Sequence, residues 1–333
     1  MPGRYIDRFQ DPQGPGDARP TALEIIKDEG LEGKLTGKVI LITGASSGIG
    51  VEAARALAMT GAKLYLTARN IKKAEAACAS FFQPDQMEFL QLELGSLDSV
   101  RKCAKEFLSK SDKLNVLINN AGIMAVPEGK TVDGFENQFG TNHLAHFLLF
   151  NLLRDTLLNS STPESNSRVV CISSSGHRTS GINFDDINYE KAGTYTPFGA
   201  YGQSKTANVY MASEIERRYG SQGLHGLSLH PGGIMSGLQK DMPKEILSAW
   251  DASPIFAKAI MNAEQGAATT VYAAVSKEWE GKGGKFLERC EEAPKVGDPR
   301  DQTAPGYVDH TYNPEAETKL WEVSLKMVGL GGK

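Results

Sequence analysis

Two side chains of this sequence are spaced for proton transfer. In Tyr201-Gly202-Gln203-Ser204-Lys205, a phenol and an ammonium group lie four residues apart in a segment whose pattern predicts a helix, so both lie on one face. A free phenol has a pKa of about 10, and a nearby fixed positive charge stabilises the phenolate and lowers that pKa. The pair could therefore serve as an acid and a base, although the same spacing also occurs by chance on helix surfaces.

A second chemical feature lies where a predicted strand meets a predicted helix. The run KVILIT is typical of a strand, and VEAARALAMTGA has apolar residues at helical spacing. Backbone N–H groups and the positive end of a helix at such a turn can bind a pyrophosphate, whereas the alternative is a glycine-rich turn that binds nothing. The residues expected in this turn to contact a ligand are Gly44, Ser46, Ser47, Gly48, Ile49 and Gly50.

Three further motifs follow predicted strands, and the five motifs in this order resemble the short-chain dehydrogenase/reductase family. The three are Asn119-Asn120-Ala121-Gly122, Ile172-Ser173-Ser174-Ser175 and His230-Pro231-Gly232. The resemblance covers residues 36–290. Details such as NHLAHFLL, ISSSGHR and the closing KLWEVS are similar to the classical branch that contains retinol-dehydrogenase-like enzymes and fungal secondary-metabolism reductases.

The resemblance implies a catalytic set of four residues. Ser174 would hydrogen-bond the substrate oxygen, Tyr201 would donate or accept its proton, and Lys205 would lower the pKa of the tyrosine while holding the nicotinamide ribose. Asn142 would help to hold a water molecule of a proton relay. The two serines that flank Ser174 would then only cap the end of a strand or turn.

The resemblance also implies a nicotinamide cofactor on the glycine-rich turn. An acidic residue after the second strand would bind a ribose 2′-OH, but the sequence there is LTARN, and Arg69 favours a 2′-phosphate. We therefore expect NADP(H) to be preferred over NAD(H). Near the adenine, Glu93 stands where the family often has an aspartate. The other residues expected at the cofactor are Leu94, Asn120, Ala121, Gly122, Pro231 and Gly232, together with Tyr201 and Lys205.

The elements that must position these residues alternate along the chain. Short β-rich runs and amphipathic runs follow one another without a visible linker or repeat. This pattern predicts an α/β chain with a single-domain Rossmann fold, a doubly wound parallel sheet of about seven strands with helices on both faces. Residues 1–36 are expected to form an N-terminal arm, residues 37–290 the domain, and residues 291–333 a C-terminal tail with a final helix.

The stretch at residues 233–256 matches the mobile substrate loop of the family, and it contains several large apolar residues. It is either an apolar lid over the substrate or an ordinary helix that covers the sheet edge. Tyr195 and Phe198, which precede the proposed catalytic helix, are candidate walls of a substrate pocket. If the 1–36 arm is peripheral, its deletion should leave the melting temperature nearly unchanged, whereas a large drop would show that it packs on the core.

Composition argues against several classes of partner. With 36 Lys+Arg, 40 Asp+Glu and a formal net charge of −4, the chain has too little charge of either sign to favour nucleic acid or a membrane surface. Four widely spaced cysteines without a CxxC pair predict reduced thiols and a cytoplasmic protein. No signal peptide or membrane span is visible. No metal is expected, because His177 and His230 have no second ligand at suitable spacing.

These observations predict an NADPH-dependent carbonyl reductase or alcohol dehydrogenase that acts on a mid-sized, largely apolar ketone, aldehyde or alcohol, in secondary metabolism. The alternative is a redox-neutral isomerase, cyclase or dehydratase on the same scaffold, because a fold does not determine a reaction. A non-catalytic nucleotide sensor is disfavoured because both Tyr201 and Lys205 are present. Both a homodimer through the two long helices and a monomer fit the pattern.

Overall fold

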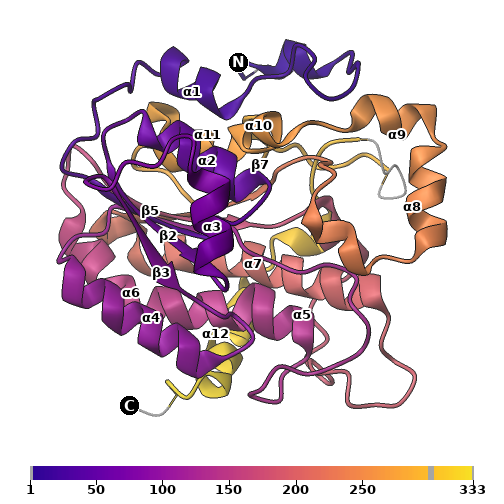
Figure 1. The fold of residues 1–333 in the computed structure, drawn as a ribbon. Coiled ribbons are helices and arrows are strands. Elements are labelled where there is room, and N and C mark those ends of the chain that lie inside the picture. Colours follow the sequence, from indigo (N-terminus) through magenta and orange to yellow (C-terminus); the bar gives the residue numbers. More distant parts are fainter. Residues whose placement is uncertain (1–2, 299–303, 332–333) are drawn as a thin grey trace.

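A computed structural model describes residues 3–298 and 304–331 of the chain. Its centre is one sheet in the order β3-β2-β1-β4-β5-β6-β7-β8 (Figure 1). The strands are β1 (Val39–Thr43), β2 (Lys63–Ala68), β3 (Met87–Gln91), β4 (Val116–Asn119), β5 (Ser167–Ile172), β6 (Leu224–His230), β7 (Lys285–Glu288) and β8 (Glu291–Glu292). Every neighbouring pair is parallel except β7–β8. The predicted doubly wound sheet is confirmed, with a short antiparallel strand added at one edge.

The central strand β1 shows why this sheet needs helices on both faces. All five of its residues are buried, and successive side chains of a strand point to opposite faces. Ile40 and Ile42 accordingly belong to one apolar cluster, while Val39 and Leu41 belong to another. A run of VILIT is thus apolar on both sides because each face is covered, as is usual for parallel sheets.

Two layers of helices supply the cover. The first apolar cluster contains residues of α1, α2, α3 and α11, and the second contains residues of α4, α6, α7 and α12. The helices are α1 (Ala22–Asp28), α2 (Ile49–Ala58), α3 (Ile71–Cys78), α4 (Leu97–Lys110), α5 (Asn137–Phe139), α6 (Ala145–Ser160), α7 (Pro197–Tyr219), α8 (Lys244–Asp251), α9 (Pro254–Ala259), α10 (Ala263–Gly266), α11 (Ala268–Val275) and α12 (Pro314–Met327).

The N-terminal segment is packed against the first layer. Tyr5 and Phe9 are buried in its apolar cluster, as are Ile25 and Ile26 of α1. Helix α1 begins with a capping box in which Thr21 and Glu24 bond each other's backbone N–H groups, and it contacts α2 and α11. Figure 1 shows this indigo segment lying across the same side as α2, α10 and α11. The segment therefore contributes buried apolar area to the core.

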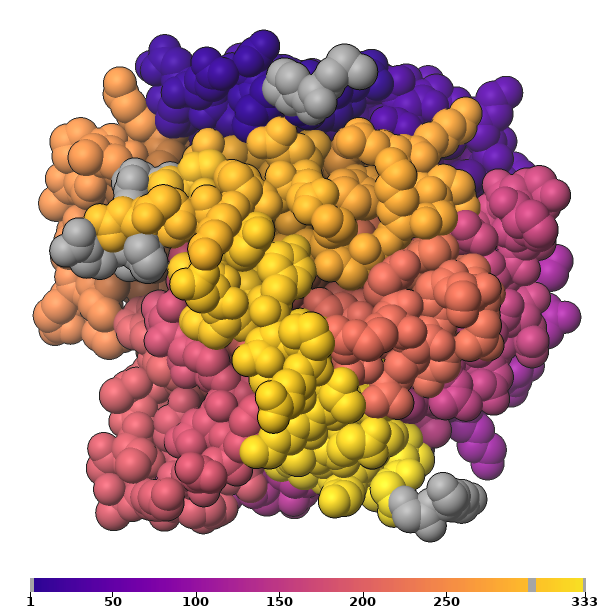
Figure 2. Space-filling model, turned by 180° about the vertical axis from the view of Figure 1, so that it is seen from behind, coloured from indigo at the N-terminus to yellow at the C-terminus, as the bar shows by residue number. Residues whose placement is uncertain are grey.

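The C-terminal segment packs on the opposite layer. Helix α12 is capped by Asn313, whose side chain accepts the N–H of Ala316, and it places Trp321 against α6 and α7 residues. Figure 2 shows this segment, in yellow, running across the back of the molecule. Residues 1–2 of the expected arm, and residues 299–303 and 332–333 of the expected tail, lie outside the described residues.

Candidate active site

The sheet brings the sequence motifs to one edge. Strands β1, β4, β5 and β6 are parallel neighbours, so the residues that follow Thr43, Asn119, Ile172 and His230 all leave the sheet at its carboxyl edge. The strand order also reverses between β1 and β4, and open α/β sheets bind ligands at such a switch point. This edge is therefore the candidate site.

Helix α7 presents Tyr201 and Lys205 to this edge, and both residues are buried, with 5% and 3% of their surface exposed. The Lys205 Nζ atom lies 5.5 Å from the centre of the Tyr201 ring, and it donates a hydrogen bond of 3.1 Å to the Ile172 carbonyl at the end of β5. The tyrosine ring passes close to Gly176, where an added Cβ would lie 2.8 Å from Cε1. The phenol ring and the ammonium group are thus buried close to each other.

The three consecutive serines after β5 have different surroundings. The Ser173 hydroxyl is buried and donates to the Lys205 carbonyl at 2.8 Å, so it ties α7 to the sheet. Ser174 caps a short 3-10 turn by accepting the Gly176 N–H at 3.0 Å, and it also hydrogen-bonds Tyr201. Ser174 is therefore the serine that the structure brings to the tyrosine.

Burial controls the proton affinities of this pair. It raises the pKa of Tyr201 to about 12, and the hydrogen bond with Ser174 acts in the lowering direction. Burial lowers the pKa of Lys205 to about 8. The sequence predicts a tyrosine pKa lowered by Lys205. In this structure burial is the largest influence on the phenol and raises its pKa, because a phenolate loses more solvation than a neutral phenol.

Asn142 joins the site from the other side. It lies in a π-helical turn, Gly140–Leu144, between α5 and α6. Its side-chain oxygen accepts the Ile123 N–H, and its side-chain nitrogen donates to the Ile123 carbonyl and to Ser204 Oγ, each at 2.9 Å. An added Cβ on Gly122 would lie 3.1 Å from Asn142 Oδ1 and 3.4 Å from Lys205 Nζ. Gly122, Asn142 and Lys205 are therefore neighbours.

The glycine-rich turn is shaped by close backbone approach. Gly48 precedes α2 with a φ of +63°, a conformation that favours glycine. A Cβ on Gly50 would lie only 2.4 Å from the carbonyl oxygen of Gly44 and 2.6 Å from Asn120 Nδ2. Asn120 in turn donates to the Thr43 carbonyl at 2.8 Å. The turn after β1 and the segment after β4 thus form one compact unit.

Several residues of the turn that are expected to contact the cofactor are at least partly exposed to solvent. Ser46 is half-buried and Ser47 is exposed, and within the described part of the chain neither hydroxyl has a protein partner. Ile49 packs towards Gly266, since an added Cβ there would lie 2.9 Å from Ile49 Cγ2. Ala121 borders Gly44, and its N–H donates to Thr43 Oγ1 at 3.0 Å. The free hydroxyls and the start of α2 form a cradle that fits a pyrophosphate.

A cationic side chain stands at the end of β2. Arg69 Nε lies 3.4 Å from Glu93 Oε2, and the two side chains are 74% and 41% exposed. The other Glu93 oxygen accepts the Gly95 N–H at 3.0 Å, while Leu94 is buried in the second apolar cluster. Arg69 and Glu93 thus form an ion pair at the site edge, with the guanidinium open to solvent.

Pro231 and Gly232 follow β6 at the same edge. Gly232 has a φ of +97° and lies directly beside Met261.

Burial lowers the pKa of His230, the residue before Pro231, to about 3 and that of His177 to about 4, so both imidazoles are neutral at physiological pH. Among residues 3–298 and 304–331, no group of three or more His, Cys, Asp or Glu side chains is arranged to hold a metal ion.

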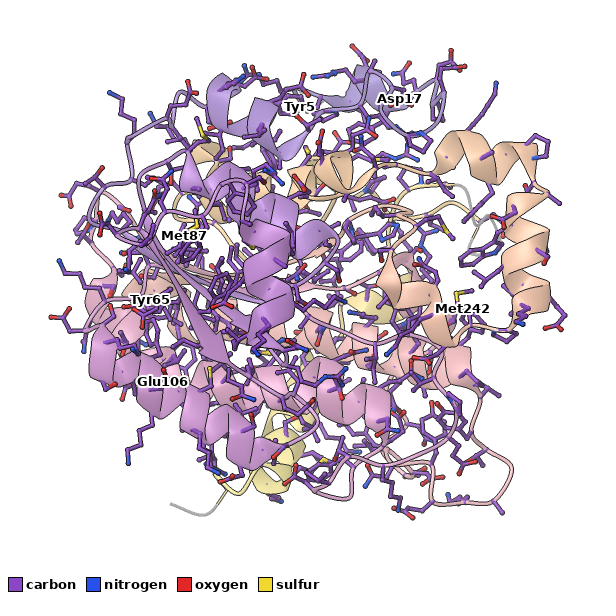
Figure 3. All side chains as sticks on the ribbon, viewed as in Figure 1. Tyr5, Asp17, Tyr65, Met87, Glu106 and Met242 are labelled. Carbon is purple, nitrogen blue, oxygen red and sulfur yellow. The ribbon has the colours of Figure 1, made fainter. Side chains whose placement is uncertain are left out.

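An apolar cluster covers Tyr201. Met242, labelled in Figure 3, is 5% exposed and lies in the cluster with Tyr201, Met124 and Ala125. The partly buried residues around it are Phe198, Leu238, Ile246, Leu247 and Trp250. Phe198 therefore lies where a pocket wall was expected. Tyr195 instead donates its hydroxyl to the Val126 carbonyl at 2.7 Å, which fixes the loop after β4.

Sequence reasoning missed two kinds of site residue. Met124 and Ala125 come directly after the Asn-Asn-Ala-Gly motif, so their nearness to that motif was the available signal. His146 gave no signal, because its contacts depend on the folded sheet: its Nε2 lies 2.9 Å from Thr43 Oγ1 and its Nδ1 lies 3.0 Å from the Asn142 carbonyl. It links the end of β1 to the π-helical turn.

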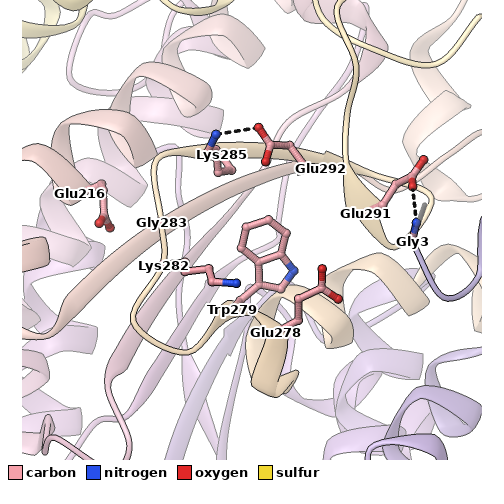
Figure 4. Close-up of a pocket in the computed structure, with 9 residues that line it drawn as sticks. All are labelled: Gly3, Glu216, Glu278, Trp279, Lys282, Gly283, Lys285, Glu291 and Glu292. Carbon is pink, nitrogen blue, oxygen red and sulfur yellow. Dashed lines mark hydrogen bonds and ion pairs between the residues drawn. The ribbon is translucent and has the colours of Figure 1, made fainter. Parts of the chain in front are cut away.

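A separate cavity of about 490 Å³ lies near the β7–β8 edge (Figure 4). Its lining includes the buried ring of Trp279 and the ion pair between Lys285 and Glu292, and Glu291 accepts the Gly3 N–H there. None of the residues that line it belongs to the candidate site.

In the described part of the chain, no helix is both long enough and apolar enough to span a membrane.

Comparison with known proteins places these features in context. The family model described as short chain dehydrogenase matches residues 38–246. The chain is 54% identical to short-chain dehydrogenase/reductase prx1 of Penicillium roqueforti, covering 98% of this chain and 96% of that protein, and 36% identical to mouse retinol dehydrogenase 12, covering 89% and 88%. A crystal structure of an uncharacterised Mycobacterium paratuberculosis protein is 34% identical, with a TM-score of 0.67, covering 89% of this chain and 95% of that one.

Proposed function

Because this chain belongs to the short-chain dehydrogenase/reductase family, and is therefore an oxidoreductase-type enzyme with a nicotinamide cofactor, we propose that it is an NADPH-dependent carbonyl reductase that is reversible as an alcohol dehydrogenase. The observation that carries the proposal is the grouping of Tyr201 with Ser174 and Lys205, with Tyr201 itself packed in the apolar cluster around Met242. We place this chemistry in the domain at residues 37–290 and, as predicted from sequence, in the cytoplasm.

The residues present fit the cofactor. Within residues 3–298 and 304–331, the hydroxyls of Ser46 and Ser47 have no protein partner, and they lie next to the start of α2, where backbone N–H groups can bind a pyrophosphate. Asn120, Ala121 and Gly122 would lie beside the adenosine side, and Pro231 and Gly232 beside the nicotinamide. When bound, the nicotinamide supplies the hydride for reduction or accepts it in oxidation.

The side chains of α7 and the β5 turn would manage the proton. Reduction of a carbonyl adds a hydride to carbon and a proton to oxygen, and Tyr201 would donate that proton from its hydroxyl. With a pKa of about 12, Tyr201 is protonated at neutral pH, as a donor must be. Ser174 would hydrogen-bond the substrate oxygen, and Lys205 would stabilise the phenolate that forms. Asn142 lies near Lys205, where it would help to hold the water molecule of a proton relay.

The cofactor preference is proposed from the end of β2. Arg69 presents an exposed guanidinium there, and its ion pair with Glu93 leaves it open to solvent. A guanidinium can bind a 2′-phosphate through two parallel hydrogen bonds. Because no carboxylate follows β2 directly to bind a 2′-OH, NADPH should bind more tightly than NADH.

The substrate class is proposed from the cover over Tyr201. The cluster contains methionine, leucine, isoleucine and aromatic side chains, so a mid-sized, largely apolar ketone or aldehyde would replace water there. The resemblance to fungal secondary-metabolism reductases supports a substrate of that kind. The alternative of a redox-neutral reaction uses the same acid–base pair without net cofactor turnover.

The deciding experiment is a carbonyl panel with NADPH and NADH. Purified protein is mixed with aromatic and aliphatic ketones, aldehydes and quinones while nicotinamide absorbance is followed, and cofactor affinity is measured by tryptophan fluorescence. We expect carbonyl-dependent oxidation of NADPH that is faster than that of NADH. Tight NADPH binding with substrate conversion but no net oxidation would instead establish the redox-neutral alternative.

A further inference from the structure

A buried arginine connects the N-terminal arm to the segment that covers Tyr201. Arg19 is 4% exposed, although it lies outside the sheet and its helical layers. Its Nη1 donates to the Ala259 carbonyl at 2.6 Å, and its Nη2 donates to the Ile260 carbonyl at 2.7 Å and to the Lys258 carbonyl at 3.3 Å. One side chain of the arm therefore holds three successive carbonyls more than 230 residues away along the chain.

The carbonyls of Lys258 and Ala259 are the last two of helix α9, and Ile260 is the C-cap residue that follows it. The final carbonyls of a helix have no partner within it and carry partial negative charge, so a cation stabilises them. Arg19 supplies that cation, and Asp17 holds it in place through a 2.9 Å contact between Oδ1 and Nε. The guanidinium is thus pre-oriented from the arm side.

A second contact fastens the arm to the next helix. Gln265 of α10 donates from Nε2 to the carbonyls of Asp17 and Arg19, at 3.1 and 3.2 Å, and accepts the Gly16 N–H at 2.9 Å. Figure 1 shows the arm lying beside α9 and α10, and Figure 3 labels Asp17 at that place. The arm is therefore hydrogen-bonded to residues 258–265 at two places, the end of α9 and Gln265.

Residues 258–261 of this anchored stretch form one end of the segment that covers Tyr201. We call residues 233–261 the lid. It begins after Gly232 and ends at Met261, which donates its N–H to the Gly233 carbonyl at 2.8 Å and forms an isolated bridge with Ile234. Between these ends, α8 and α9 contain no fully buried residue. Because α8 and α9 bury so little of their own surface, the position of the lid depends on the contacts at its two ends.

We propose that Arg19 is a positioning residue for the lid: it fixes the end of α9, and thereby keeps Met242 and its neighbours over Tyr201 when an apolar carbonyl substrate binds. The inference rests on the proposed function for its catalytic consequence, but the contact between arm and lid stands on geometry alone. Arg19 touches neither the cofactor cradle nor the catalytic side chains, so its influence passes through the lid.

The test compares full-length Arg19→Ala with a matched control in the same arm. Arg8 is the control, because it bonds Glu24 and the Ala18 carbonyl and makes no contact with the lid. Amide hydrogen exchange is measured without substrate in peptides spanning residues 235–258. We expect Arg19→Ala to raise exchange there by about fivefold or more, and Arg8→Ala to leave it at the wild-type rate, since lid opening is local.

The kinetic readout separates positioning from general damage. Arg19→Ala should raise KM for the apolar carbonyl by about fivefold or more, while the Kd for NADPH changes by less than about twofold, because only the substrate side loses its alignment. Arg19→Lys, which keeps the charge but cannot bridge three carbonyls, should give intermediate exchange and an intermediate KM.

The two proposals can fail separately. If the wild-type protein reduces no carbonyl, the proposed function fails, while hydrogen exchange in residues 235–258 still tests the Arg19 contact. If lid exchange in both Arg19→Ala and Arg19→Lys equals that of the wild type, the inference is overturned. An equal rise of exchange throughout the sheet would also overturn it, because that result marks a general stability role. Should Arg19→Ala not fold, Arg19→Lys alone carries the same comparison.

Discussion

The cofactor cradle and the lid lie at the same edge of the sheet, yet they are built in opposite ways. The cradle is formed by backbone contacts between two short motifs, and Gly50 stands so close to Gly44 that no side chain fits. The lid is largely exposed, and Ile255 within it is 68% exposed. Its base is held by Arg19 from the far end of the chain. One half of the site is therefore rigid by local structure, and the other is positioned by long-range contacts.

This contrast suits a division of labour. A cofactor common to a family can be bound by a fixed surface, since its shape does not vary. The proposed substrate-binding cover would have to open and close, and elements that move are drawn from the less stable part of a structure. Tyr201 lies where the two halves meet, buried below Met242 and next to Lys205.

The largest effect is expected at that meeting point. Tyr201→Phe removes the proton donor while keeping the ring that packs in the apolar cluster, so turnover should fall by about 10²- to 10⁴-fold. The Kd for NADPH should change little, because the cradle is untouched. Steady-state kinetics and fluorescence titration measure the two quantities, and retained turnover would remove Tyr201 from the proposed mechanism.

A pair of glycines tests the cradle against the lid. Gly50→Ala would place a methyl carbon 2.4 Å from the Gly44 carbonyl oxygen, whereas a Cβ on Gly237 in the lid meets nothing within 4 Å. We expect Gly50→Ala to weaken NADPH binding by about 100-fold or more, since the turn must open to accept the methyl group. Gly237→Ala should bind NADPH like the wild type. Similar affinities for both variants would contradict a rigid cradle.

The same contrast explains which parts of the molecule could be predicted from sequence. The sheet could be, because each strand is a short apolar run such as VILIT next to an amphipathic run, and parallel order follows from their alternation. The association of Tyr201 with Lys205 could also be predicted, because a helix places residues four apart on one face. The grip of Arg19 on the end of α9 could not, because nothing local indicates a contact across 240 residues.

The direction in which the Tyr201 pKa shifts could not be predicted from the sequence either. The charge of Lys205 could be read from the motif, but the loss of water around the phenol depends on Met124, Ala125 and Met242 closing over it. That cluster joins three separate segments of chain. Burial then sets the proton affinity, and its effect exceeds that of the hydrogen bond from Ser174.

Two isoleucines test where stability resides. Ile25 of α1 is fully buried in the first apolar cluster, whereas Ile255 of the lid is 68% exposed. Ile25→Ala should lower the free energy of unfolding by about 2–5 kcal/mol, through lost burial and the cavity left behind. Ile255→Ala should change it by less than about 0.5 kcal/mol. Denaturant titration measures both, and a small effect at Ile25 would mean that the N-terminal arm is peripheral after all.

The smallest effect is expected at the exposed edge of the cradle. Arg69→Ala should weaken NADPH binding by about tenfold and leave NADH binding nearly unchanged, since only NADPH carries the 2′-phosphate that a guanidinium would bind. The effect is modest because the Arg69 side chain is 74% exposed, and water screens exposed charge pairs. Arg154→Ala, which removes an arginine from an ion pair with Asp155 on α6, is the matched control.

Glu93 sharpens this last test, because it competes with a phosphate for the same guanidinium. Its carboxylate contacts Arg69 at 3.4 Å and is itself held by the Gly95 N–H. Glu93→Gln keeps the bond from Gly95 but removes the charge, so it should leave Arg69 freer to bind the 2′-phosphate and should tighten NADPH binding slightly relative to NADH. If Glu93→Gln instead weakens NADPH as much as Arg69→Ala does, the carboxylate acts by orienting the guanidinium. In that case even this exposed edge of the cradle is pre-formed, and the contrast with the lid extends to the whole cofactor half.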